Sequence, residues 1–142
     1  MTRITRHQAN AQLAEGVRAD LAACGVILEL LESQFDCAMR HRSAELAELA
    51  RRLEPELAAM EARRQQRVAL VRALLGQDGT MAGFIATLGE TAREQLAADW
   101  AALERLVIEC KRATTRNSSL LAEQYSVMQR VLHGEEQTYA PR

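Results

Sequence analysis

Apolar residues recur every three or four positions along most of the chain, which is the spacing of one face of an α-helix. Polar segments at residues 40–42 and 76–79 interrupt the pattern, and the second segment holds two glycines suited to ending a helix. The pattern predicts an all-α fold: an antiparallel bundle of three long helices plus one short helix, in a single domain covering residues 1–142. We predict helices at 8–39, 43–75, 80–88 and 91–133, followed by a short polar tail at 134–142.

Several helix boundaries carry their own sequence signal. Ser43 is placed to accept a hydrogen bond from an early backbone N–H as the N-cap of the second helix, and Thr80 is placed to do the same for the short helix. Thr91 and Glu94 have the Thr-x-x-Glu spacing of a capping box, which predicts the start of the last helix. Gly134 follows the last apolar run and predicts its C-cap.

The composition supports helices and excludes several classes of function. Of the 142 residues, 48% are hydrophobic and only 4% are aromatic, and the apolar residues are mainly Ala and Leu, which favour helices. A net charge of −1 gives no general attraction to phosphate or anionic lipid, so we expect neither nucleic-acid binding nor membrane insertion. The longest apolar run, residues 21–28, is too short to cross a bilayer, and the amino end shows no secretory signal. We therefore expect a cytoplasmic protein.

Residue types that carry catalysis or bind metals are present, but they are not grouped in the sequence. The three cysteines contain no Cys-x-x-Cys pair, and Cys24 and Cys110 fall on apolar stripes, where a thiol packs as a small hydrophobe. Each of the three histidines lies apart from possible metal ligands. No phosphate-binding glycine loop, no His-Glu-x-x-His motif and no nucleophile with a neighbouring base is visible. We expect no enzyme activity, no metal and no cofactor.

The last helix should be longer than its neighbours. At about 1.5 Å per residue it would extend roughly 65 Å, whereas each of the first two long helices would extend roughly 48 Å. In an up-down bundle with short connections, the last helix begins beside the closed end of its neighbours. Its second half is therefore the part that we expect to be least covered.

A polar run over residues 114–119 interrupts the apolar stripe of this last helix, at Thr114 and Asn117 in particular. Two interpretations are open. The run has low helix propensity, costing roughly 2–3 kcal/mol relative to Ala, which favours a hinge. Alternatively, Asn117 is a buried polar residue that sets the register of packing, as in coiled coils, and the helix continues.

The apolar stripe resumes after this run, where the two neighbouring helices are too short to cover it. Contiguous exposed apolar surface on a protein of this kind usually marks a binding site, and an amphipathic helix is suited to pairing with a helix of another protein. Asn117 lies at the beginning of this stretch. The predicted partner-binding residues are Asn117, Leu120, Leu121, Tyr125, Met128, Val131 and Leu132.

Three segments of the chain resemble the flagellar export chaperones of the FlgN family: residues 28–74, the segment RNSSLLAEQYSVMQRVL, and the final QTYAPR. The most recognisable element is the Asn117-x-x-Leu120-Leu121 step, followed by a linker and the Thr138-Tyr139 pair. The resemblance implies a cytosolic helical chaperone that holds hook-filament junction proteins before type III export. It also implies that the carboxyl-terminal helix binds a terminal amphipathic helix of the client, and that Tyr139 helps to dock the complex on the export gate.

Two other classes of function remain open at this stage. In the first, the last helix completes a homodimer in a structural coiled-coil or adaptor protein with no role in export. A helical-bundle enzyme is the weaker alternative, because the sequence shows no recognisable set of catalytic residues.

Overall fold

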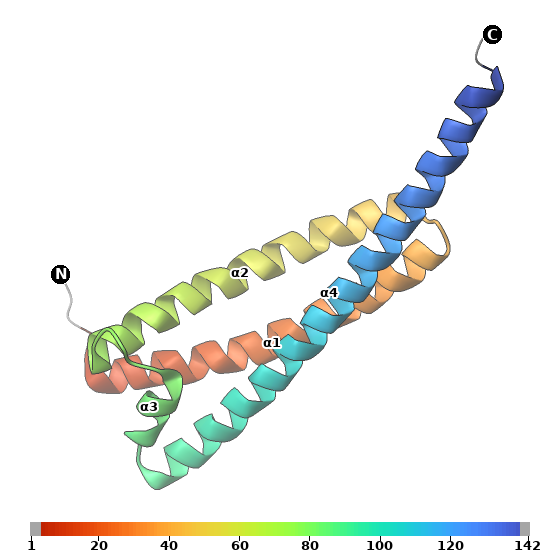
Figure 1. Cartoon of the computed structure of the whole chain (residues 1–142). Helices are drawn as coiled ribbons and strands as arrows, with labels where there is room; N and C mark the ends of the chain where they lie inside the picture. Colours follow the sequence, from red (N-terminus) through yellow and green to blue (C-terminus); the bar gives the residue numbers. More distant parts are fainter. Residues whose placement is uncertain (1–3, 140–142) are drawn as a thin grey trace.

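The computed structural model describes residues 4–139 of the chain, and the side chains of residues 4–134. This part of the chain contains helices and no strand, so the predicted all-α fold is confirmed. The helices are α1 (Arg6–Met39), α2 (Ser43–Leu75), α3 (Met81–Ala86) and α4 (Glu90–Tyr139) (Figure 1).

Helix α1 lies at the centre of the molecule, and both other long helices pack against it (Figure 1). Each long helix runs opposite to the long helix before it, as predicted for an antiparallel bundle. Within the described chain, no Cα atom of α2 lies within 8 Å of a Cα atom of α4. The backbones of the two outer helices are therefore connected through α1 along their lengths, and through the short α3 at one end.

The core consists of two groups of buried apolar side chains. The first group surrounds α3 and includes Phe84, which is completely buried. Its members are Leu13, Val17, Cys24, Val71, Met81, Phe84, Ile85, Leu96 and Leu103. The second group lies toward the turn between α1 and α2 and consists of Ile27, Leu30, Leu31, Cys37, Leu49, Leu53 and Ala113.

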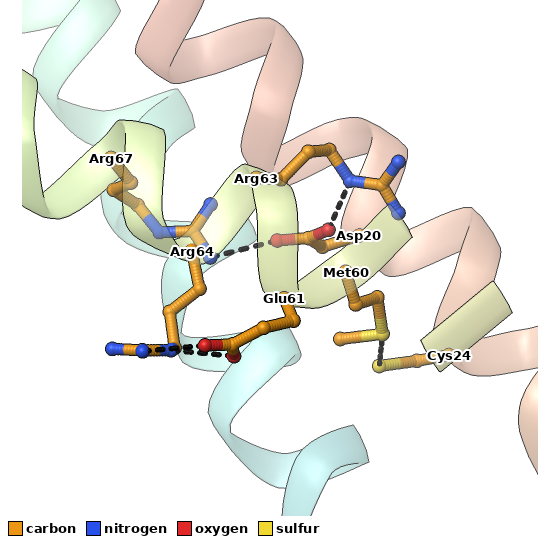
Figure 2. Close-up of polar contacts among 7 residues, drawn as sticks. All are labelled: Asp20, Cys24, Met60, Glu61, Arg63, Arg64 and Arg67. Atoms are coloured by element: carbon orange, nitrogen blue, oxygen red, sulfur yellow. Dashed lines mark hydrogen bonds and ion pairs between the residues drawn. The ribbon is translucent and has the colours of Figure 1, made fainter. Parts of the chain in front are cut away.

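A buried carboxylate joins α1 to α2 beside the first of these apolar groups (Figure 2). Asp20 is completely buried; Arg63 donates a hydrogen bond from Nε to Asp20 Oδ1, and Arg67 donates to Asp20 Oδ2 at 2.8 Å. The guanidinium of Arg67 also lies 5.5 Å from the centre of the Trp100 ring, which extends the cluster to α4. A buried charge needs such partners because an unpaired one is very costly to desolvate.

The nearby Glu61 and Arg64 form an exposed ion pair on α2 (Figure 2). Both nitrogens of the Arg64 fork contact the Glu61 carboxylate, at 2.7 and 2.8 Å. Hydrogen bonds from Arg64, and then from Gln65, lower the pKa of Glu61 to about 2. An exposed pair of this kind contributes little to stability, so Asp20 is the ionic contact that matters for the packing of α1 on α2.

The helix starts differ from the predictions in three places. Helix α1 begins two residues earlier than predicted, where Thr5 and Gln8 form a capping box. The N-cap of α2 is Arg42, without a side-chain hydrogen bond, so the prediction of Ser43 as N-cap was wrong. The reason is the tight turn before it, in which His41 has a positive φ of 55° and the Arg42 amide bonds to the Cys37 carbonyl.

The start of α4 also differs from its predicted capping box. Helix α4 begins at Glu90, and the amide of Arg93 already bonds to the carbonyl of Gly89 at 2.8 Å, which places Thr91 inside the first turn. The prediction for the short helix was correct at its start, because Thr80 Oγ1 accepts a hydrogen bond from the Gly83 amide at 3.0 Å. This helix ends at Ala86 rather than at residue 88.

At its other end α4 continues through Gly134 to Tyr139, so the predicted C-cap at Gly134 was wrong. A glycine inside a helix costs only about 1 kcal/mol relative to alanine, which the surrounding helical residues can offset. The segment predicted as a polar tail is therefore helical as far as Tyr139, and its last three residues lie outside the described residues.

Candidate functional site

The carboxyl-terminal part of α4 projects beyond the turn that joins α1 to α2 (Figure 1). Gln124 makes the last described hydrogen bond between the projecting part and α1, donating from Nε2 to the Ala38 carbonyl at 2.9 Å. From residue 125 to residue 134, every residue is exposed. Because α4 is longer than α1 and α2, no other helix covers its end, as the sequence predicts.

Large apolar side chains lie along this projecting segment in contact with solvent. Exposure ranges from 37% for Leu121 to 64% for Tyr125. We call this set the exposed α4 face; it consists of Leu121, Tyr125, Val127, Met128, Val131 and Leu132. All of them except Val127 were predicted from the sequence, while the predicted Leu120 is half-buried. Val127 precedes Val131 by one helical turn, so the periodic pattern contained a signal for it.

Asn117 lies apart from the exposed α4 face and is buried, with 1% of its surface exposed. Its Nδ2 donates hydrogen bonds to the Leu31 carbonyl and to Gln34 Oε1, each at 2.8 Å. This is the arrangement of the second interpretation, in which a buried amide fixes how two helices pack. Asn117 thus holds α4 on α1 immediately before the exposed face begins.

Arg116 strengthens the same junction from the adjacent position. Its Nε donates to Asn117 Oδ1 at 3.1 Å, and a terminal nitrogen lies 3.2 Å from the Glu32 carboxylate. The guanidinium also stacks 4.0 Å from the centre of the Phe35 ring. Because five side chains from the last turns of α1 and from α4 meet here, the direction in which α4 projects is well defined.

Residues 114–119, where the sequence left a hinge open, belong to an uninterrupted α-helix. The Thr114 hydroxyl donates a hydrogen bond to the Cys110 carbonyl at 2.8 Å. A bond of this kind competes with the hydrogen bonds of the helix backbone and is associated with bending of the helix. The packing of Asn117 opposes the low propensity of this run. Tyr139 is the last described residue of α4, and its side chain lies outside the described residues.

The thiols show no sign of nucleophilic chemistry. Cys24 donates to the thioether of Met60 at 3.9 Å, and Cys110 donates to the Cys24 carbonyl at 3.7 Å (Figure 2 shows the first contact). Burial, followed by the proximity of Cys110, raises the pKa of Cys24 to about 11. Burial likewise raises the pKa of Cys110. Both thiols are protonated at neutral pH, the opposite of what a reactive cysteine requires.

Metal sites and membrane spans are both absent from the described residues. Among them, no three His, Cys, Asp or Glu side chains are grouped as a metal site would need. Within the same residues, no helix has an apolar stretch of the length that a bilayer crossing demands.

The fold and the exposed α4 face together define a helical bundle in which the end of one amphipathic helix is left uncovered. A family model described as FlgN protein matches residues 1–134 of this chain. The chain therefore belongs to the FlgN family, a family of flagellar export chaperones that bind flagellar proteins. A search of curated proteins and a search of solved structures each found no match.

Proposed function

We propose that this protein is a cytoplasmic, non-enzymatic chaperone of flagellar type III secretion whose clients are the hook-filament junction proteins, also called hook-associated proteins. In this proposal the exposed α4 face pairs with a terminal amphipathic helix of the client. Covering that helix prevents premature assembly and keeps the client suitable for export. The complex then docks on the export gate with the help of Tyr139.

The observation that carries the proposal is the exposed α4 face. Tyr125 and Met128 are 64% and 59% exposed, and they lie among four more apolar residues on the same projecting segment. Leaving such a surface in water is unfavourable, and the flexible Met side chain adapts well to uneven partner surfaces. A client helix would bury this surface in the way that one helix of a bundle buries its neighbour.

Asn117 has a supporting role in this proposal. Its burial against α1 leaves it without surface to offer a client in this conformation, but it fixes the position of the helix that carries the client-binding residues. We therefore place the client contacts at Leu120, Leu121, Tyr125, Val127, Met128, Val131 and Leu132, with Asn117 as their anchor.

The experiment replaces two residues of the exposed α4 face by aspartate, as Leu121→Asp with Met128→Asp. We expect loss of the one-to-one complex with purified hook-filament junction proteins, while the melting temperature from circular dichroism stays within a few degrees of the parent. The melting temperature should hold because a carboxylate at an exposed position remains hydrated, whereas in a core it would cost several kcal/mol.

A matched control carries the same added charge on the neighbouring side of the same segment, as Ala122→Asp with Ser126→Asp, and should bind normally. Binding by the Leu121/Met128 variant would contradict the proposal, as would a collapsed melting temperature. If the parent forms a homodimer that this variant loses, and no junction protein binds the parent, the alternative of a structural coiled-coil or adaptor protein is favoured.

A further inference from the structure

A groove lies between α2 and α4, because both helices pack on α1 while their Cα atoms stay more than 8 Å apart within the described chain. It has a volume of about 420 Å³, and its lining is mainly apolar. We call it the α2–α4 groove. Cys24 and Ile27 of α1 line it, together with Leu57 and Met60 of α2 and Val107, Cys110, Lys111, Thr114 and Thr115 of α4.

The short helix α3 shows how this space between the outer helices is filled at one end. Its side chains Met81, Phe84 and Ile85 are buried together with residues from all three long helices. Helix α3 stops at Ala86 and fills only the end of the bundle where α4 begins (Figure 1). Farther along, Leu57 on the wall of the groove is 52% exposed. The groove beyond α3 is therefore left open to side chains of a partner.

The groove and the exposed α4 face lie along one side of the same helix. Val107, Lys111 and Thr114 line the groove, and Leu121, Tyr125, Met128 and Leu132 continue their series at steps of three, four and seven. Positions related in this way share a helix face. The distance from residue 107 to residue 132 is roughly 37 Å at about 1.5 Å per residue. A partner helix of about 25 residues would reach from one end of this surface to the other.

The charge in the groove indicates what kind of helix fits it. Lys111 is the one charged residue among those lining the groove, and it has no ion-pair partner among the described residues. A carboxylate on the partner, beside its apolar stripe, would give Lys111 the partner that it lacks.

We propose that the α2–α4 groove receives one end of an amphipathic partner helix, whose remainder lies on the exposed α4 face and whose acidic flank meets Lys111. The helix would occupy the place beside α3 and make α2 part of the binding surface. This inference rests on the proposed function, because the occupant is taken to be the client helix.

The test measures the affinity of the Leu57→Glu variant for the hook-filament junction protein that binds the parent best. We expect binding to weaken about tenfold or more, because the change removes an apolar contact and adds a charge that must be desolvated. Val26→Glu is the matched control, since Val26 is an exposed apolar residue of α1 outside the groove. It should bind within about twofold of the parent.

Two further variants show whether a loss of binding comes from the groove itself or from disturbed folding. Leu57→Ala removes the side chain without adding charge, and it should weaken binding even if Leu57→Glu disturbs folding. Lys111→Glu should weaken binding and reduce its dependence on salt, because one ion pair across the interface becomes a repulsion.

The outcomes separate this inference from the proposed function. If no junction protein binds the parent or the Val26→Glu control, the proposed function fails. If Leu57→Ala and Lys111→Glu both bind like the parent while the Leu121/Met128 variant does not, the function stands and the groove proposal is overturned. Light scattering that shows a homodimer lost only in the Leu57 variants would assign the groove to a second copy of the chain and also overturn it.

Discussion

At the scale of single residues, two buried polar side chains determine how the long helices pack. Asp20 receives hydrogen bonds from two arginines of α2, and Asn117 of α4 donates to the backbone of α1. Each lies in an otherwise apolar interface, where a polar group must be satisfied in one particular arrangement. Together they connect α1 to both outer helices.

The Asp20→Asn variant should lower the free energy of unfolding by about 3–5 kcal/mol, because it leaves two partly buried arginines without their counter-charge. Chemical denaturation followed by circular dichroism measures the change. Asp36→Asn is the control: Asp36 forms an exposed ion pair with Arg40, and its loss should cost at most about 1 kcal/mol. Equal effects of the two changes would show that Asp20 is not a structural charge.

The two buried residues differ in how well the sequence predicts them. Asn117 interrupts a long apolar stripe, so its burial was one of two interpretations open at the outset. Asp20 gave no comparable signal, because the neighbouring Leu21 continues the heptad-like spacing and is the natural choice for the buried position. The partners of Asp20 are 43 and 47 residues away in sequence, and only the folded chain brings them together.

At the scale of elements, α4 is one helix with two environments. Up to Asn117 it packs on α1, whereas beyond Gln124 its described residues are exposed. Local stability should follow this division rather than the helix propensity of residues 114–119, because buried contacts determine how often a segment opens.

Amide hydrogen exchange in the free protein should therefore be slow from Leu103 to Asn117 and become at least about tenfold faster after Gln124. Mass spectrometry of peptides or NMR measures the position of this change. A sharp rise at Thr114 instead would mean that the polar run opens despite Asn117, as the hinge interpretation requires. Adding a bound client should slow exchange after Gln124 if the exposed α4 face is covered.

Element limits could be predicted well where periodicity determines them and less well where single contacts do. The limits of α2 agree with the prediction at both ends, because polar and glycine-rich segments border its apolar stripe. The start of α1 depends on the Thr5–Gln8 capping box, which lies before the first apolar residue of the stripe. The end of α4 lies beyond Gly134, a residue whose preference for helix ends is weak enough for other factors to override it.

At the scale of the whole molecule, relative helix lengths predicted the projecting end of α4, and the structure has that shape (Figure 1). The separation of α2 from α4 had no such signal. The angle at which two helices cross depends on how their side chains interdigitate, which a periodic pattern does not specify. The exposed α4 face was therefore predictable from the sequence, whereas the α2–α4 groove required the three-dimensional arrangement of Leu57, Met60 and Val107.

Tyr139 provides a prediction about the assembled export system. The Tyr139→Ala variant should bind its client with unchanged affinity, because residue 139 lies beyond the exposed α4 face, yet secretion of the client should fall several-fold. Pull-down and secretion assays in cells measure the two properties separately. Tyr139→Phe retains the ring and tests whether the hydroxyl is needed. Normal secretion by the alanine variant would remove Tyr139 from the proposed docking contact.

The central position of α1 also has a consequence for synthesis on the ribosome. Helix α1 is made first, and α2 can fold onto one side of it once residues up to Leu75 have emerged. The other side of α1 is covered progressively as α4 follows, first by Leu96 and Leu103 and last by Asn117, which bonds to the Leu31 carbonyl. Residues 121–132 emerge after that. A nascent chain therefore acquires the exposed α4 face only after the contacts that hold this face in place can form.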